Sequence, residues 1–389
     1  MPQFNQNKLK KLKKIDKLLS FLLPSRTLKN RYIANVNNKE IIIIAFFLIG
    51  DTVMYLPALR VIRKNFPNSK ITLICTKVVE IVLKEQNLVD QFIIVDCPWI
   101  APFNKSLKNI FSFFKKIHTI NKSKYDICID FRGDWRNIFY MNFINSKNKV
   151  SFNASGGEYM LTHPIECNVN ISHYTDEGIY LLQQLGLKIT DENKFPKLLL
   201  NDKDKLLINT YIKECGFENK FIIGLHPGVS ASADARKWDD NKFVEFINSL
   251  HQFDENIVFL LYEGPNEKET IINICEKLNK NIQYVVVKKT LSQYIKLLNA
   301  SNLLICNDSG AGHLAAAYNI PVLVIFGKAD PQAVKPLGNN VSIISHELDC
   351  KPCNQHICPL GTNECIKNIT VDEVLDEVKK ILNSATISK

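Results

Sequence analysis

Residues 41–52 read IIIIAFFLIGDT and set the expectation for the whole chain. The first nine of them, residues 41–49, form the longest apolar run and are rich in β-branched side chains. The run is much shorter than the roughly 18 apolar residues of a membrane-spanning helix, and it is typical of a strand buried on both faces. We therefore expect a parallel sheet, with Gly50 and Asp51 in the turn after its first strand.

Strand-like and helix-like segments alternate outward from this run. The first series has strands expected at 41–47, 71–76, 92–96 and 125–131, and helices at 52–65, 78–86, 105–120 and 135–144. This series is followed by a less regular stretch at 147–170 and by helices at 173–185 and 202–215. A second series then has strands at 221–225, 256–262, 283–287, 303–306 and 322–326, and helices at 241–253, 267–278, 291–298 and 311–318. A last helix is expected at 371–382. This alternation predicts parallel sheets with helices on both faces. With 389 residues, we expect two doubly wound α/β domains at 41–200 and 201–389, preceded by an arm at 1–40.

Positive charge is concentrated in this arm. The chain carries 49 Lys and Arg against 39 Asp and Glu, a net charge of +10, and residues 1–40 supply +8 of it with ten basic and two acidic side chains. The rest of the chain is nearly neutral, which argues against a nucleic-acid-binding body. The hydrophobic content of 46% excludes a mostly disordered chain.

The arm also has helical spacing of apolar residues among its lysines: Leu9, Leu12, Ile15, Leu19 and Leu22, ending at Pro24. A helix of this kind presents an apolar stripe flanked by positive charge, which suits an anionic membrane surface; a solvated tail is the alternative. The apolar stretch at 18–23 is too short for a signal peptide, and no small-residue cleavage site follows it. We expect the chain to stay in the cytoplasm.

Cysteine usage divides into two classes. Seven of the eleven cysteines are scattered singly and are expected to be reduced thiols. The other four fall within 16 residues, as Cys350, Cys353, Cys358 and Cys365. Four thiols can bind zinc or an iron–sulfur cluster, but only the first spacing is typical of a zinc site, so a structural metal, disulfides and free thiols all stay open.

Ligands of doubly wound sheets bind at the carboxyl ends of the strands, so the loops there are the candidate sites. Asp51 follows the first strand, and it reads equally as a helix N-cap or a general base. In the second domain, the loop at 226–238 contains several small residues and then two adjacent cations, Arg236 and Lys237. These cations can neutralise a bound anion, or they can simply be solvated. Glu267 is either a ribose-binding acid or a first-turn helix acid.

The loop at 307–317, which reads NDSGAGHLAAA, is the most specific of these candidates. Asp308 or Ser309 can cap the following helix, and Gly310 clears space at its N-terminus, where free N–H groups can bind a phosphate. His313 is more often structural than catalytic at such a position.

Together these segments resemble glycosyltransferase family 9, the bacterial lipopolysaccharide heptosyltransferases. The resemblance covers residues 41–384 and is carried by the Gly50-Asp51 turn, His226-Pro227-Gly228, Lys237-Trp238, the motif at 307–316 and the cysteine segment. It implies a GT-B fold, with two Rossmann-like domains facing across a cleft. It also implies inverting, metal-independent transfer of a heptose from ADP-L-glycero-D-manno-heptose to an inner-core sugar (Kdo or heptose) of lipid A, at the inner face of the cytoplasmic membrane.

By the same resemblance, Asp51 takes the position of the general base, with Gly50 and Thr52 in the acceptor loop. Donor-binding residues in the second domain are then Arg236, Lys237, Glu267, Asp308, Ser309, Gly310 and His313. One departure concerns the cation two residues before the loop's Trp, which is usually Lys and here is Arg236. A different nucleotide sugar or acceptor is therefore one alternative, and a non-catalytic sugar-nucleotide-binding protein is another.

Overall fold

The computed structural model describes residues 40–387 apart from 101–105, 191–194, 230–235 and 354–357, together with Asp16, Ser20 and Ile33; side chains are described as far as residue 384. The chain divides into two compact units between Pro196 and Lys197, which we call the N-domain and the C-domain. The predicted arm at 1–40 lies outside the described residues except for those three positions and residue 40.

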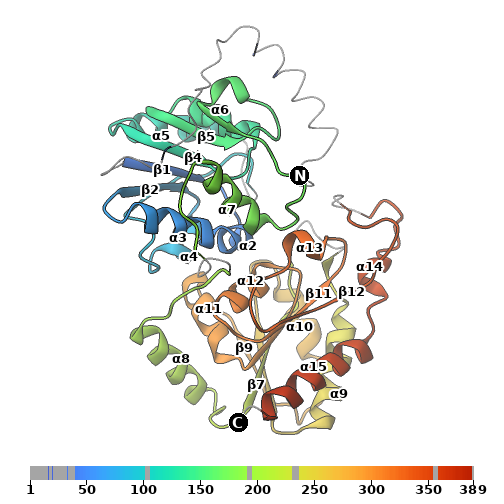
Figure 1. The fold of residues 1–389 in the computed structure, drawn as a ribbon. Helices are drawn as coiled ribbons and strands as arrows, with labels where there is room; N and C mark the ends of the chain where they lie inside the picture. Colours follow the sequence, from blue (N-terminus) through green and yellow to red (C-terminus); the bar gives the residue numbers. More distant parts are fainter. Residues whose placement is uncertain are drawn as a thin grey trace. The chain divides into compact units, whose positions relative to one another are not determined.

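The N-domain is built on a parallel sheet of six strands in the order β3-β2-β1-β4-β5-β6. Its strands are β1 (Glu40–Ala45), β2 (Lys70–Cys75), β3 (Gln91–Ile94), β4 (Tyr125–Asp130), β5 (Ser146–Phe152) and β6 (His163–Ile165). Its helices are α2 (Ile49–Met54), α3 (Leu56–Asn65), α4 (Lys77–Leu83), α5 (Leu107–Ile120), α6 (Trp135–Asn142) and α7 (Tyr174–Gln184). Figure 1 shows α5 and α6 on one face of the sheet and α3, α4 and α7 on the other.

The isoleucine run explains this layering. Successive strand residues point to opposite faces, so Ile42 and Ile44 pack into the core beneath α5 and α6, while Ile41 and Ile43 face the other layer. All four side chains are fully buried. Covering both faces requires an uninterrupted apolar strand, which is what the sequence has.

The C-domain repeats the same plan, with strand order β12-β11-β10-β7-β8-β9, all pairs parallel. Its strands are β7 (Phe221–His226), β8 (Ile257–Tyr262), β9 (Tyr284–Val287), β10 (Leu303–Asn307), β11 (Val322–Phe326) and β12 (Val341–Ser345). Its helices are α8 (Asp202–Glu214), α9 (Asp240–Phe253), α10 (Lys268–Cys275), α11 (Leu291–Leu297), α12 (Gly310–Ala317), α13 (Pro331–Val334), α14 (Glu364–Lys367) and α15 (Val371–Ile387). Numbered within its own domain, each sheet has the Rossmann order 3-2-1-4-5-6. The expected α/β fold class is confirmed.

The structure differs from the sequence prediction mainly at the sheet edges. The stretch at 147–170 contains the strands β5 and β6, and β12 closes the second sheet; all three were missed. β5 opens with polar residues and β6 contains Pro164, which suits a strand at the edge of a sheet. The single helix expected at 52–65 is two helices, α2 and α3, which meet at Tyr55.

Among the described residues, no helix is both long enough and apolar enough to cross a bilayer.

Candidate functional site

Asp51 lies in the first turn of α2, directly after β1. Its Oδ2 accepts a hydrogen bond from the backbone N–H of Leu48 at 3.2 Å, so the carboxylate helps to cap the helix. The Thr52 hydroxyl donates to the Leu48 carbonyl at 2.7 Å, which holds the same turn, and Gly50 precedes Asp51 in the helix. The side chain of Asp51 is still 28% exposed, so capping leaves it accessible to a reactant.

Arg132 joins Asp51, although the sequence alone did not single it out. β1 and β4 are parallel neighbours, with Ile44 opposite Asp130, so the loops at their carboxyl ends meet. Arg132 places Nη1 3.4 Å from Oδ2 of Asp51 and 3.2 Å from the carbonyl oxygen of Phe46. The guanidinium therefore holds the carboxylate in place. This contact joins residues 81 positions apart, and only knowledge of the strand order could have revealed it.

A buried carboxyl, Asp130, shapes the turn that carries Arg132. It accepts hydrogen bonds at 2.7 to 2.9 Å from the Gly133 N–H, the Asn137 amide and the Ser151 hydroxyl. Burial raises the pKa of Asp130 to about 6, although these hydrogen bonds oppose the shift. Gly133 has φ +63°, and a Cβ there would lie 2.8 Å from a side-chain atom of β5, so the turn requires glycine.

In the C-domain, charged side chains gather at the carboxyl ends of β7, β10 and β11. Asp308 follows β10 and is 7% exposed. Its Oδ2 lies 3.5 Å from Nη1 of Arg236, in the loop after β7. Burial raises the pKa of Asp308, and the charge of Arg236 and then that of Lys328 oppose the shift. Two cations and one carboxylate give the cluster a net positive charge, which favours binding of an anion.

Lys328, in the loop after β11, is the second residue that sequence reasoning missed. It is 9% exposed, and burial followed by the nearby Arg236 charge lowers its pKa. Its carbonyl oxygen accepts a hydrogen bond from the N–H of Cys353 at 3.0 Å, which ties this loop to the cysteine segment. A lone lysine after a strand carries no motif, so its role depends on the adjacency of β10 and β11.

Asn307, the last residue of β10, connects two of these loops. Its Oδ1 accepts from the N–H of Trp238 at 3.0 Å, and its Nδ2 donates to the carbonyl of Pro227 at 2.7 Å. Trp238 is fixed in turn, since it is 1% exposed and its Nε1 donates to the Ile369 carbonyl at 2.9 Å. The segment that presents Arg236 is therefore tied down at both ends.

The predicted anion-binding motif lies at the start of α12. Ser309 is the N-cap residue, but its side chain does not cap the helix, and its buried hydroxyl has no hydrogen-bond partner among the described residues. Gly310 begins the helix, and the next seven residues, His313 among them, are buried. The Ser309 hydroxyl and the free N–H groups of the first turn are thus available to a phosphate.

Glu267 is buried in the loop after β8, at the carboxyl end of the same sheet. Its Oε2 accepts from the Gly264 N–H at 2.7 Å and lies 3.8 Å from Nδ1 of His226. Burial raises the pKa of Glu267 to about 7 and lowers the pKa of His226 to about 4. The imidazole is therefore neutral at pH 7, and its Nδ1 lies 3.0 Å from the Tyr294 hydroxyl. Gly228 packs on the Glu267 carboxyl so closely that no Cβ would fit.

Lys237 has partners other than Asp308, although its charge also opposes the rise in the pKa of Glu267. Its Nζ donates to Oγ1 of Thr270 at 2.7 Å and lies 2.8 Å from Oδ1 of Asp240. It lines a hollow of about 320 Å³ between α9 and α10, along with Asn273 and Lys277. Arg236 and Lys237 therefore face different surroundings, and the donor-binding role expected of Lys237 stays a prediction.

The eleven cysteines form no disulfide in the structure. Within the described part of the chain, no three His, Cys, Asp or Glu side chains are placed to hold a metal ion, so the structural metal considered for Cys350, Cys353, Cys358 and Cys365 has no support there. Residues 354–357, inside this segment, are outside the described set.

Comparison with known proteins identifies the family. The model for glycosyltransferase family 9 (heptosyltransferase) matches residues 113–363, so the chain belongs to this family and is a glycosyltransferase. Lipooligosaccharide heptosyltransferase 2 of Campylobacter jejuni is 25% identical over 347 residues, which are 87% of this chain and 96% of that protein.

Solved structures agree with the fold. A family 9 glycosyltransferase from Veillonella parvula superposes with a TM-score of 0.75 at 20% identity, covering 91% of this chain and all of that one. The ADP-heptose lipopolysaccharide heptosyltransferase II of Escherichia coli gives a TM-score of 0.72 at 18% identity, covering 89% of this chain and 99% of its own. The expected GT-B class is thereby confirmed.

Proposed function

We propose that this family 9 enzyme transfers a heptose, with inversion, from ADP-L-glycero-D-manno-heptose to an inner-core sugar (Kdo or heptose) of lipid A. The proposal draws its substrates from relatives named as heptosyltransferases of lipooligosaccharide and lipopolysaccharide. The observation that carries it is the Asp51–Arg132 pair, an accessible carboxylate held by a guanidinium at the carboxyl end of β1.

Asp51 acts as the general base on the acceptor. Leu48 and Arg132 both contact Oδ2, which leaves Oδ1 for the acceptor hydroxyl. As the hydroxyl oxygen attacks C1 of the heptose, its proton passes to the carboxylate. The bond between C1 and the diphosphate oxygen breaks on the opposite face, and ADP leaves with the bonding electrons. One displacement of this kind inverts C1 and needs one base together with charge stabilisation at the leaving group.

The C-domain stabilises the leaving diphosphate. Arg236 and Lys328 supply positive charge, and Arg236 is held by Asp308 at 3.5 Å. The Ser309 hydroxyl and the N-terminus of α12, beginning at Gly310, donate hydrogen bonds to the phosphates. Asp308 contacts the heptose.

Two further donor residues complete the proposal. Glu267 binds the ribose of ADP, and His313, buried in α12, supports the phosphate-binding turn. The transfer as written uses no cofactor.

A second donor is favoured by one observation. Arg236 occupies the position where the family usually has Lys, and its fork-shaped guanidinium binds a diphosphate with a different geometry from an ammonium group. This difference favours, as the alternative, a family 9 transferase that uses another nucleotide sugar or acceptor.

A donor and acceptor panel tests both candidates. Purified full-length protein is incubated with each of several nucleotide sugars and with truncated lipid A cores, and mass spectrometry detects the added sugar. Transfer from ADP-heptose supports the leading proposal, whereas transfer only from another donor supports the alternative. Tight nucleotide-sugar binding without transfer to any core would indicate a non-catalytic binding protein.

We also propose that the enzyme works at the inner face of the cytoplasmic membrane, because its acceptor is a lipid. The net charge of +8 in residues 1–40 suits an anionic surface. Deletion of residues 1–38 should weaken binding to anionic liposomes and leave donor binding unchanged. Equal liposome binding after the deletion would indicate that the arm is a solvated tail with no role in membrane binding.

A further inference from the structure

The outer surface of α5 exposes apolar side chains that the N-domain core does not use. Leu107 is 86% and Phe111 73% exposed, and one helical turn separates them, so they share a face. Isolated exposed apolar residues are ordinary on protein surfaces, but contiguous ones mark contact sites. The pair is therefore significant only as part of a larger apolar patch.

A row of aromatic rings extends the patch across α6. Trp135 stacks on Phe139 with ring centres 5.2 Å apart, and Phe139 meets Phe143 at 5.1 Å. Phe143, which is 44% exposed, contacts Phe114 of α5 at 6.1 Å. These rings and the exposed pair on α5 lie on the same side of the N-domain sheet, and we call them the α5/α6 surface.

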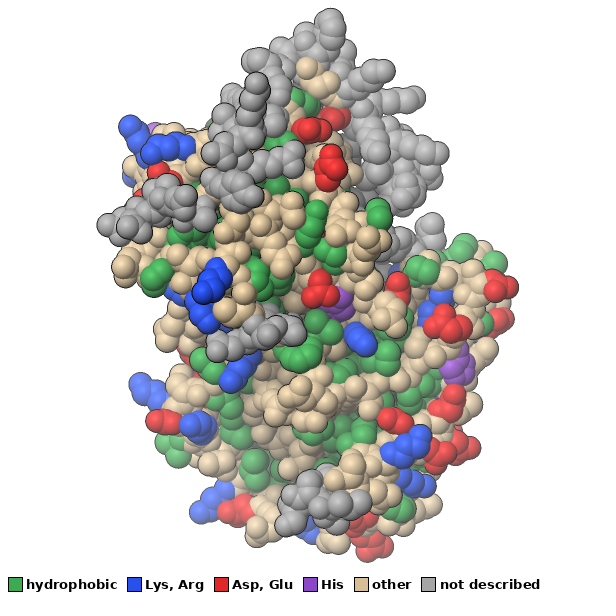
Figure 2. All heavy atoms as spheres, viewed as in Figure 1, with side chains coloured by type: hydrophobic (Ala, Val, Ile, Leu, Met, Phe, Trp, Pro, Cys, Tyr) green, Lys and Arg blue, Asp and Glu red, His purple; other side chains and the backbone are tan. Residues whose placement is uncertain are grey.

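Positive charge predominates in the sequence of α5 and its flanks. From residue 97 to residue 124 the sequence contains six lysines and no Asp or Glu. Lys108 and Lys115 are exposed on α5, near Leu107 and Phe111. In Figure 2, Lys and Arg side chains gather at the edge of the N-domain where Figure 1 places α5.

The carboxylates nearest to this surface are mostly neutralised. Asp134, at the start of α6, pairs with Arg136, and Asp126 pairs with Lys147. Asp96 is exposed at the edge of the surface. Lysines surrounding aromatic and aliphatic side chains form the combination that binds the interface of an anionic bilayer.

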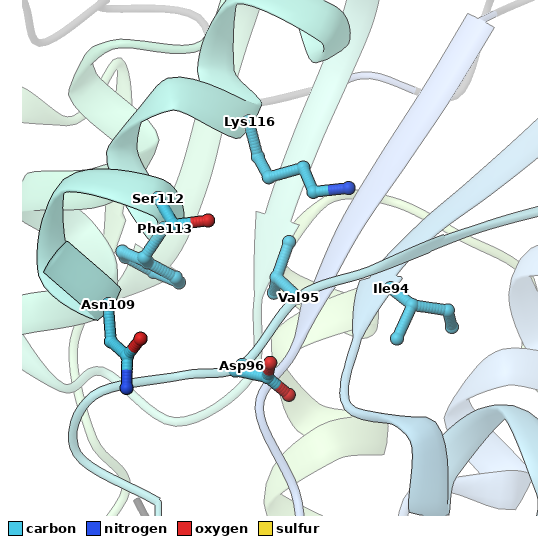
Figure 3. A pocket seen from close by; sticks show the side chains of 7 residues that line it. All are labelled: Ile94, Val95, Asp96, Asn109, Ser112, Phe113 and Lys116. Carbon is cyan, nitrogen blue, oxygen red and sulfur yellow. The ribbon is translucent and has the colours of Figure 1, made fainter. Parts of the chain in front are cut away.

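Asp96 belongs to a polar cavity of about 160 Å³ between α5 and the segment after β3 (Figure 3). Asn109, Ser112 and Lys116 reach into it from α5, opposite Asp96. A cavity lined by ammonium, carboxylate, amide and hydroxyl groups can accommodate a polar lipid headgroup while the neighbouring apolar side chains enter the bilayer.

Asp16, one of the few described residues before β1, contacts the residues beside this surface. Asp16 accepts hydrogen bonds from Nε1 of Trp135 and from the N–H of Gly157, each at 2.8 Å. Gly156, with φ +104°, leaves room for the carboxylate, because a Cβ there would lie 2.5 Å from Oδ2 of Asp16. Asp16 thus lies beside Trp135, at one end of the aromatic row.

We propose that the α5/α6 surface is the face on which this protein binds an anionic phospholipid bilayer. The inference rests on the proposed function only in that a lipid-linked acceptor gives membrane binding a purpose. A bilayer is favoured over a protein partner because residues 97–124 contain six lysines and no acidic residue, and the exposed apolar side chains of α5 lie among them.

Liposome co-sedimentation of the full-length protein tests this assignment. Vesicles of phosphatidylcholine are compared with vesicles containing one quarter phosphatidylglycerol. Leu107→Ser with Phe111→Ser should lower the apparent partition coefficient on anionic vesicles at least tenfold, and Lys108→Glu with Lys115→Glu should do the same. These side chains are exposed, so the fold should tolerate the changes.

Matched controls come from α8 of the C-domain, where Leu206 is 67% exposed. Two control variants are made there, Leu206→Ser and the double variant Lys203→Glu with Lys213→Glu. The apparent partition coefficient of each on anionic vesicles should lie within about twofold of that of the unchanged protein. Unchanged binding of both α5 variants would overturn the proposal. So would a homodimer in sedimentation velocity that the α5 changes dissociate, since a second copy would then be the occupant.

Transfer to a soluble, delipidated core acceptor is measured in parallel. The α5 variants should retain it, because none of the changed residues belongs to the proposed catalytic or donor-binding set. Loss of liposome binding with intact transfer supports the docking surface. Absence of transfer in every protein, the unchanged one included, would refute the proposed function and leave the liposome result valid in its own right.

Discussion

The two domains share one strand order, and in both the candidate site residues follow the carboxyl ends of the strands. The exposure of these side chains differs between the domains. In the N-domain, Asp51 and Arg132 follow strands 1 and 4, and their side chains are 28% and 24% exposed. In the C-domain, Asp308 follows strand 4 and Glu267 follows strand 2, and their side chains are 8% and 9% exposed.

The difference matches the two chemical tasks that we propose for these domains. A base must meet an incoming hydroxyl, so it stays accessible. A diphosphate site can bury its charges, because the ligand itself brings the charge that offsets the cost of desolvation.

Removing the accessible base should have the largest effect. Asp51→Asn keeps the shape of the side chain but cannot take the acceptor proton, so kcat should fall about 10²- to 10⁴-fold. Donor affinity, measured by calorimetry with ADP, should stay within twofold, because the groups assigned to the donor lie in the other domain. Transfer at the normal rate in this variant would refute the base assignment.

The donor side should respond in affinity. Lys328→Ala removes a buried cation next to Arg236 and Asp308, and ADP should bind roughly 10- to 100-fold more weakly, as for loss of a charged hydrogen bond. Lys237→Ala is the matched comparison, since Lys237 already contacts Thr270 and Asp240. Calorimetry should show a smaller loss for Lys237. The reverse order would assign the phosphate-binding cation to Lys237.

Burial of Glu267 should appear in the pH dependence of stability. Its pKa rises from 4.5 to about 7 on folding, so between these values the folded protein keeps a proton that the unfolded chain has lost. Stability therefore falls as pH rises through this window, and Glu267→Gln should remove a decline on the order of 2 kcal/mol. Urea unfolding at pH 5 and pH 8 measures it.

Glu269→Gln changes an exposed carboxyl in the first turn of α10, two residues after Glu267, and provides the control for that experiment. Its unfolding free energy should follow the unchanged protein at both pH values. A Glu267→Gln profile that also follows the unchanged protein would show that Glu267 is not buried as a protonated acid.

The smallest effect concerns the turn that carries Arg132. Gly133→Ala places a Cβ at φ +63° and 2.8 Å from β5, and should cost about 1 to 2 kcal/mol of stability. Gly216→Ala is a stringent control, because Gly216 has a similar φ of +69° but open space around it. Equal losses in urea unfolding would mean that backbone conformation alone, without crowding, requires glycine at 133.

The sequence revealed those site residues that carry a local signal. Asp51 follows an unmistakable strand, and the motif around Asp308 brings its own glycines and alanines. Arg132 and Lys328 were missed because their roles come from strands that lie side by side in space, which no local pattern records.

The same limit applies to the sheet edges and to side-chain direction. β5 and β12 are edge or near-edge strands with polar or half-buried residues, so the apolar signal that revealed β1 is weak there. Adjacent cations at 236 and 237 looked equivalent in sequence, but the backbone turns one towards Asp308 and the other towards Thr270.

The double hydrogen bond of Asn307 has a kinetic consequence. Because one amide bonds to both Pro227 and Trp238, separating either residue from β10 breaks a hydrogen bond. If ADP binds beside Arg236 as proposed, we expect its release to be slowed by these two bonds. The residence time of the product would then depend on a side chain that touches neither sugar nor phosphate.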